Sequence, residues 1–268
     1  MFRSMATDLF NYFAGERVLQ RGGSALALVI GALTLLFAVN AEAQSNVAAG
    51  TATIDRSLAR LSTALASSRI GTVLVVVGSS STVGIGASSP LNAYVARLEV
   101  NLERALQGLD FRVIGRGVSG EMAQGAADRM QREVAAAKPD LVIWQVGTND
   151  ALRHVAVESF EGCLRRTLAW LKEQRIDVIL VNPQYGDALV KDAYYENMVA
   201  SIAKVADEAQ VLLVDRFGAM RGWSRDRAYL SKDNLHMNDE GYARLAEQIA
   251  SKIVMALPRN GLVLTATR

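Results

Sequence analysis

The sequence predicts an α/β domain in which helices cover both faces of a five-stranded parallel sheet, a three-layer α/β/α sandwich. Two observations predict this fold. Apolar runs of strand length alternate along the chain with amphipathic stretches of helix length, as in βαβ units. The first run, residues 72–77, is apolar at every position except its first, as expected of a strand buried on both faces. The sequence shows no internal repeat and no second domain.

Five segments are predicted to be strands because each is short, apolar and rich in β-branched residues. Glycine or hydroxyl residues interrupt the first strand at Gly78, and Asn182-Pro183 stops the fourth. The predicted strands are residues 72–77, 111–114, 141–146, 176–181 and 211–214.

Helices are predicted where apolar residues recur at helical spacing. The second helix begins at Pro90 and ends near Gly108, and the third covers residues 122–137 and ends before Pro139. Five predicted helices, the second among them, have a clear apolar stripe. In chain order the stripes are Ile54, Leu58, Leu61 and Leu65; Leu91, Val95, Leu98, Leu102 and Leu106; Phe160, Leu164, Leu168 and Leu171; Met198, Ile202, Val205 and Ala209; and Tyr242, Leu245, Ile249 and Ile253. Long loops are predicted after the fourth strand and over residues 215–237.

Composition limits the chemistry that the chain can perform. Half of the 268 residues are hydrophobic and the formal net charge is +2, so no basic field favours a nucleic acid partner. The single cysteine, Cys163, excludes an intramolecular disulfide and any multi-cysteine metal site, and we interpret it as a core residue. Chemistry that needs histidine must use His154 or His236.

The N-terminal residues resemble a secretory signal. Arg17 and Arg21 precede an uncharged run over residues 24–39, and Ala41-Glu42-Ala43 follows as a small-x-small cleavage site. The run is shorter than the roughly 20 residues of a membrane-spanning helix. An uncleaved anchor is the alternative, and without one the mature protein has no membrane span. The protein is expected to be exported, to the periplasm or outside the cell.

These features divide the chain into four parts. Residues 1–43 form the signal, residues 44–70 a linker and the first helix, residues 71–258 the main domain, and residues 259–268 a C-terminal tail.

A serine-rich turn follows the first strand, in the sequence Gly78-Ser79-Ser80-Ser81-Thr82-Val83-Gly84. Ligand chemistry in open α/β sheets takes place at the carboxyl ends of the strands, so Ser80 is a candidate nucleophile. A plain loop is the alternative.

A second glycine-rich stretch, residues 115–120, matches G-x-G-x-x-G after a strand and suggests a dinucleotide site. We reject this interpretation. The fingerprint belongs after the first strand, whereas residues 115–120 follow the second, and Asp140 begins the third strand instead of ending one.

Asp233-Asn234-Leu235-His236 lies just before the last helix. A serine needs a base to lose its proton at neutral pH, and a carboxylate that orients the histidine makes it a better base. An aspartate three residues before a histidine can meet its ring in a turn. Alternatively, Asp233 caps a turn and His236 is merely exposed.

The other histidine, His154, has no acidic partner at a matching spacing and is interpreted as a loop residue.

Gly147-Thr148-Asn149-Asp150 closes the third strand. The Asn149 amide could stabilise an oxyanion together with the backbone N–H groups of Ser80 and Gly117. Asn149 could also be an ordinary turn residue.

Together these segments resemble the SGNH (GDSL-type) hydrolases, a family of esterases and lipases. The family begins with Gly-Asp-Ser-x-Thr-x-Gly, which residues 78–84 match except at Ser79. Its further blocks Gly-x-Ser-Gly, Gly-x-Asn-Asp and Asp-x-x-His are matched by residues 117–120, 147–150 and 233–236. The resemblance covers residues 72–256.

The resemblance implies the flavodoxin-like SGNH hydrolase fold and a role for each matched residue. It makes Ser80 the nucleophile, His236 the base and Asp233 its orienting partner, with Ser80, Gly117 and Asn149 forming the oxyanion hole. It implies neither cofactor nor metal. Ser79 replaces the family aspartate, which alters the turn beside the nucleophile.

The function expected is an exported serine esterase that cleaves short-chain acyl, lipid or O-acetylated carbohydrate esters through an acyl-enzyme. Two alternatives are an O-acyltransferase that acts on polysaccharide and a non-catalytic carbohydrate-binding relative. The aromatic residues of the two long loops are expected either to line a substrate pocket or to pack over helix ends. They are Tyr185, Tyr194, Tyr195, Trp223 and Tyr229.

Overall fold

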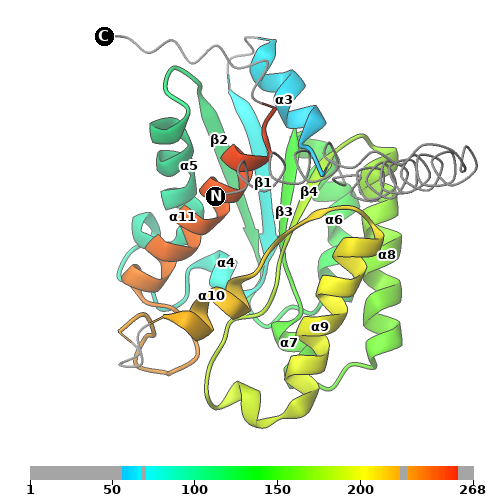
Figure 1. Ribbon diagram of the computed structural model, residues 1–268, viewed down its shortest axis with the longest axis vertical. Helices are drawn as coiled ribbons and strands as arrows, with labels where there is room; N and C mark the ends of the chain where they lie inside the picture. The colour runs from blue at the N-terminus through cyan, green and yellow to red at the C-terminus, as the bar shows by residue number, and fades with distance from the viewer. Residues whose placement is uncertain (1–55, 68–70, 224–227, 259–268) are drawn as a thin grey trace, which may run out of the picture. The chain divides into compact units, whose positions relative to one another are not determined.

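The computed structural model describes residues 56–67, 71–223 and 228–258, all within the compact unit Asp55–Arg268 (Figure 1). The predicted signal, the linker, Ile54 and the C-terminal tail lie outside the described residues. The described residues form one sheet of five parallel strands in the order β2-β1-β3-β4-β5. The strands are β1 (Thr72–Gly78), β2 (Phe111–Gly117), β3 (Leu141–Gln145), β4 (Asp177–Val181) and β5 (Leu212–Val214). The predicted α/β fold is confirmed.

Helices pack on both faces of the sheet because alternate strand residues point to opposite sides (Figure 1). Leu74 and Val76 of β1 belong to one apolar cluster, and Val75 and Val77 to the other. The first cluster includes residues of α3 (Ala59–Ala66), α5 (Tyr94–Ala105) and α11 (Asp239–Ala256). The second includes residues of α6 (Ala123–Ala137), α8 (Val157–Glu173) and α9 (Ala193–Glu208). Cys163 is buried in the second cluster, as predicted.

The strand register brings three loops to one edge of the sheet. Gly78, the last residue of β1, pairs with Gly117, the last residue of β2. Val77 pairs with Trp144 near the end of β3. The segments that follow β1, β2 and β3 therefore leave the sheet side by side.

Two predicted elements differ in the structure. Pro90 starts a short 3-10 turn, Pro90–Asn92, and α5 begins only at Tyr94. The side chain of Leu91 is 79% exposed and does not join the apolar stripe of α5. Strand β2 continues through Gly115–Gly117, beyond the predicted end at residue 114, because these residues pair with Val76–Gly78.

Within the described ranges, three short helices were not predicted. They are α4 (Ser80–Val83), α7 (Thr148–Leu152) and α10 (Arg216–Gly222), and a second 3-10 turn, Leu189–Lys191, lies in the loop after β4. Each short helix follows a strand at the carboxyl edge of the sheet: α4 follows β1, α7 follows β3 and α10 follows β5. Among the described residues, no helix has the length and apolar character needed to cross a membrane.

Candidate active site

Ser80 is the first residue of α4, directly beyond the buried strand β1. Ser79 is the N-cap, and its carbonyl oxygen accepts the backbone N–H groups of Thr82 and Val83 at 2.9 and 3.1 Å. The N–H of Ser80 comes too early in α4 to find an acceptor within that helix. This N–H group is therefore available to donate a hydrogen bond to a ligand at the carboxyl edge of the sheet. Ser80 itself is partly exposed.

His236 lies next to Ser80, although 156 residues separate them in the sequence. The Nε2 atom of His236 is 2.8 Å from Ser80 Oγ, and its Nδ1 atom is 2.6 Å from Asp233 Oδ2. If Nδ1 carries the ring proton and donates a hydrogen bond to the carboxylate, Nε2 presents its lone pair to the serine hydroxyl. The arrangement can remove the Ser80 proton.

Asp233 is held by a turn of its own segment. Its Oδ1 atom accepts the backbone N–H groups of Leu235 and His236, both at 2.9 Å, and the Ser231 hydroxyl at 2.7 Å. Asn234 takes the left-handed conformation with φ 56° that this turn needs. Partial burial raises the pKa of Asp233, but the hydrogen bonds from His236 and Ser231 outweigh it and hold the pKa well below its ordinary value. Asp233 is therefore ionised at neutral pH.

Gly117 lies against the backbone of α4. A Cβ atom at this position would come within 2.6 Å of Val83 N and 2.8 Å of the Thr82 carbonyl carbon, so no side chain fits without moving α4. The next residue, Val118, donates its N–H to the Gly78 carbonyl at 3.0 Å. The end of β2 is thus fixed beside the turn that carries Ser80.

Asn149 projects from α7, whose N-cap Gly147 has the left-handed φ of 98°. Its Nδ2 atom donates a hydrogen bond to the Glu121 carbonyl at 2.9 Å. An amide nitrogen carries two hydrogens, so this bond orients the group and leaves one hydrogen for another acceptor. Asn149 lines a small cavity that Ser79 and Thr148 also line.

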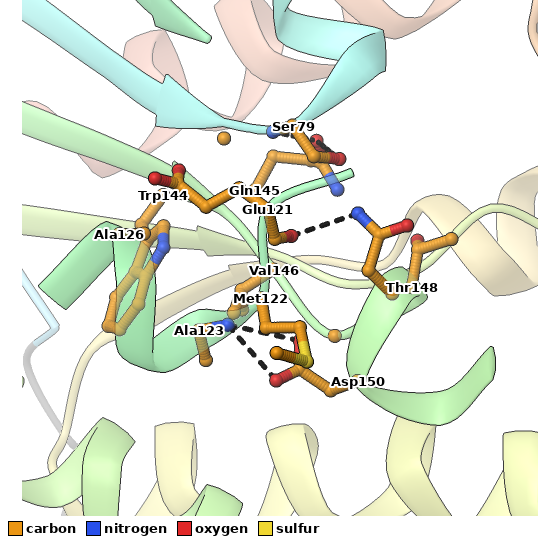
Figure 2. Close-up of a pocket in the computed structure, with 13 residues that line it drawn as sticks. Ser79, Glu121, Met122, Ala123, Ala126, Trp144, Gln145, Val146, Thr148 and Asp150 are labelled. Atoms are coloured by element: carbon orange, nitrogen blue, oxygen red, sulfur yellow. Dashed lines mark hydrogen bonds between the residues drawn. The ribbon is translucent and has the colours of Figure 1, made fainter. Parts of the chain in front are cut away.

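The Asp150 carboxylate has a role that the sequence did not reveal. Both of its oxygens accept the backbone N–H of Ala123, at 3.0 and 3.2 Å, where helix α6 begins (Figure 2). Burial raises the pKa of Asp150, and the hydrogen bond from Ala123 counteracts part of that rise. Asp150 therefore ties α7 to the segment that contains Glu121, the partner of Asn149.

Glu121 is itself anchored by a nearly buried ion pair. Arg129 Nε and Nη2 donate to the two carboxylate oxygens of Glu121 at 2.7 and 2.6 Å, and Nη2 also donates to the Arg116 carbonyl at 2.8 Å. Because Arg129 belongs to α6, these hydrogen bonds fasten the segment between β2 and α6 to the side of α6. The carbonyl that orients Asn149 is fixed as a result.

Ser79, which departs from the family pattern, points toward β3. Its backbone N–H and its hydroxyl both donate to Gln145 Oε1, at 3.2 and 3.4 Å (Figure 2). Ser79 is buried and lies outside the Ser80–His236–Asp233 chain of hydrogen bonds. The altered residue supports the turn and leaves Ser80 free to contact His236.

His154 is a loop residue, as predicted, and it has an acidic partner that is distant in the sequence. Its Nε2 atom lies 2.8 Å from Asp192 Oδ2, and its ring stacks on Tyr194. Asp192 lies 38 residues further along the chain, at the N-cap of α9, so local spacing does not reveal the pair. Both side chains of the pair are about half exposed, and His154 remains in a loop.

Four of the aromatic residues that the sequence analysis placed in the two long loops pack against other parts of the protein, and two of them, Tyr194 and Tyr195, lie in helix α9 instead of a loop. Tyr195 is buried and donates to the Gln184 carbonyl, and Tyr194 donates to the Val155 carbonyl. Trp223 makes an edge contact with Tyr229. Of the two interpretations of these residues, the structure therefore favours packing against the protein over lining a substrate pocket for these four.

In the part of the chain that the structure describes, no group of three or more His, Cys, Asp or Glu side chains could hold a metal ion.

Comparison with known proteins gives consistent matches. A model of the Non-GDSL lipase-like family matches residues 44–257. Esterase TesA of Pseudomonas aeruginosa is 27% identical over 180 residues, which cover 66% of this chain and 85% of that protein. Acetylxylan esterase of Geobacillus stearothermophilus is 27% identical over 175 residues, or 60% of this chain and 80% of that protein.

A solved structure extends the likeness to three dimensions. The lipase/acylhydrolase from Enterococcus faecalis superimposes with a TM-score of 0.61 at 25% sequence identity, covering 69% of this chain and 97% of that one. The similarity thus spans at least 80% of each of these relatives.

Proposed function

The chain belongs to the Non-GDSL lipase-like family, and from this premise we propose that it cleaves acyl esters through a covalent intermediate on Ser80. The match and the esterase relatives confirm the resemblance to the SGNH (GDSL-type) hydrolases, and the protein is a carboxylic ester hydrolase. The proposal adds the residues, the intermediate, the substrate class and the location.

The continuous chain of hydrogen bonds from Ser80 Oγ through His236 to Asp233 carries the proposal. Ser80 Oγ attacks the ester carbonyl carbon while His236 Nε2 takes the hydroxyl proton. Asp233 accepts a hydrogen bond from the Nδ1–H group of His236 and stabilises the imidazolium that forms. Collapse of the tetrahedral intermediate breaks the ester C–O bond, and His236 returns the proton to the departing alcohol.

The negative oxygen of that intermediate needs donors already in position. The Ser80 N–H, the Gly117 N–H and the free amide hydrogen of Asn149 are the donors that we assign. Gly117 lies against α4 and Asn149 is oriented by Glu121, so neither group has to reorganise during the reaction.

Water completes the cycle. His236 removes a proton from a water molecule that attacks the acyl carbonyl, and the acid leaves Ser80 with the proton returned to Oγ. No cofactor takes part in this sequence of steps.

The proposed substrates are small-molecule or carbohydrate esters, with short-chain acyl, lipid or O-acetyl groups. Relatives named esterase and acetylxylan esterase support this range. Export is proposed from the signal-like residues 1–43. If a sugar hydroxyl replaced water as acceptor, the same site would transfer the acyl group, and product analysis with a glycan acceptor separates transfer from hydrolysis.

A fluorophosphonate probe tests the proposal. It forms a stable phosphonyl ester only with an activated serine, so folded wild-type protein is expected to gain one adduct, mapped by mass spectrometry to Ser80, and to lose aryl-ester hydrolysis in proportion. Protein unfolded in urea provides the control. A folded protein that takes up no probe contradicts the acyl-enzyme.

A further inference from the structure

Arg216 is a fully buried arginine behind the candidate active site. It is the first residue of α10, and its exposed fraction is 0%. Its Nε atom donates to the Asn182 carbonyl at 3.0 Å, its Nη2 atom to Gln184 Oε1 at 2.9 Å, and its Nη1 atom to Ser81 Oγ at 3.4 Å. All three acceptors are neutral.

No carboxylate among the described residues forms an ion pair with Arg216. Burial lowers the pKa of its guanidinium, and interactions with the hydroxyl groups of Tyr195 and Tyr94 counteract part of that effect. Arginine nevertheless keeps its charge in proteins. A buried cation without a counter-ion is costly, and an apolar side chain of similar size often serves stability as well or better. We therefore expect Arg216 to have a role other than stabilising the fold.

The bonds of Arg216 link the two short helices of the site. Gln184 Oε1, which accepts from Arg216, also accepts the Thr148 hydroxyl at 2.9 Å. Ser81 follows Ser80 in α4, and Thr148 precedes Asn149 in α7. A continuous bridge, Ser81–Arg216–Gln184–Thr148, thus joins the helix of the proposed nucleophile to the helix of the proposed oxyanion donor.

We propose that Arg216 is a positioning residue that sets the distance between the Ser80 and Asn149 sides of the oxyanion hole. The inference rests on the proposed function. Oxyanion donors act within a narrow range of about 2.7–3.1 Å from the developing charge. They sit here on two separate helices of four and five residues, and such short helices have little internal rigidity.

A guanidinium suits this task better than an ammonium. Its nitrogens are fixed in one plane, so two of them bind Ser81 and Gln184 at a set separation while the third binds the Asn182 carbonyl. The lysine side chain ends in one nitrogen on a flexible stem, and it cannot span the same three acceptors. The positioning role therefore predicts that lysine does not restore activity, although it restores charge.

Two variants and a control test the inference. Arg216→Met and Arg216→Lys are expected to lower kcat about 10²-fold, the order of effect caused by a 1 Å misplacement, with KM changed less than about threefold. Met220→Ala, which creates a cavity under the same helix, is the control for a general loss of stability. It is expected to lower the melting temperature and to leave the kcat of the folded protein unchanged.

Amide hydrogen exchange provides a readout that is independent of hydrolysis. Exchange in α4 and α7 is expected to quicken in both Arg216 variants and to stay unchanged, relative to the rest of the protein, in Met220→Ala. If Arg216→Met does not fold, Thr148→Val breaks the same bridge at its far end with a side chain of the same shape, and the same pattern is expected at smaller amplitude.

The outcomes separate this inference from the proposed function. Full kcat in Arg216→Met, full recovery in Arg216→Lys, or unchanged exchange in α4 and α7 would each overturn the positioning role. Absence of hydrolysis and of Ser80 labelling in the wild type would instead overturn the proposed function, and the exchange experiment would still decide whether Arg216 holds the two helices.

Discussion

Gln145 Oε1 accepts both the backbone N–H and the hydroxyl of Ser79, at 3.2 and 3.4 Å. This contact accounts for the serine at the position where the resembling family has aspartate. A hydroxyl can donate to the oxygen that Gln145 presents, whereas an ionised carboxylate only accepts hydrogen bonds and would face another acceptor. The change at Ser79 and the polar residue at the end of β3 are thus two parts of one interaction.

Gln145→Leu tests this interaction. The substitution leaves the buried Ser79 N–H without its acceptor, so the free energy of unfolding is expected to fall by about 1–3 kcal/mol in urea titrations. Ser79→Ala is the matched control. It removes the longer hydroxyl bond and keeps the N–H bond, so its loss is expected to be smaller. Equal stability of wild type and Gln145→Leu would show that the contact is unimportant.

Because the pKa of Asp233 is lowered in the folded protein, the free energy of unfolding is expected to depend on pH in a specific way. Hydrogen bonds depress its pKa in the folded protein, so its contribution to stability is complete above the unfolded value of about 3.9 and is lost as the pH falls through the folded value. The stability difference between wild type and Asp233→Asn is therefore expected to shrink as the pH falls below about 4. Urea unfolding at pH 7, 5 and 3 measures it, and a difference that stays the same at pH 3 would contradict the assignment.

Asp233→Asn is also expected to lower kcat about 10⁴-fold, because an amide oriented by the same turn no longer favours the Nδ1-protonated tautomer of His236. Kinetics at pH 7 with an aryl ester measure the effect. A loss below about tenfold would mean that Asp233 does not orient the base.

Asn149→Ala removes one proposed oxyanion donor. The value of kcat is expected to fall by about 10²–10³, with little change in KM, because the bond forms only when charge develops on the substrate oxygen. Asn101→Ala, on helix α5, is the control and is expected to leave both constants unchanged. A rise in KM at constant kcat would assign Asn149 to substrate binding instead.

The sequence predicted the parts of the protein that depend on local pattern. The strands and the longer helices follow from apolar spacing, and the turn of Asp233 and His236 lies within four residues. Ser80 and His236 were paired by resemblance to known blocks, because nothing in the local sequence states that residues 156 positions apart lie 2.8 Å from each other.

The parts that were missed depend on contacts between distant segments or on very short elements. Helices α4 and α7 span about one turn, too short to show periodicity. Arg216 follows an aspartate in a segment predicted to be a loop, where an arginine is normally exposed. Its partners Gln184 and Ser81 lie 32 and 135 residues away, so its burial became evident only in the folded chain.

The most direct measurement of the central claim is hydrolysis of a short-chain aryl ester by Ser80→Ala. Loss of the nucleophile is expected to reduce kcat by about 10⁶, while Ser251→Ala, at an exposed serine of helix α11, is expected to keep wild-type activity. Circular dichroism confirms that both variants are folded. Ser80→Ala protein that retains most of the activity would contradict the acyl-enzyme mechanism.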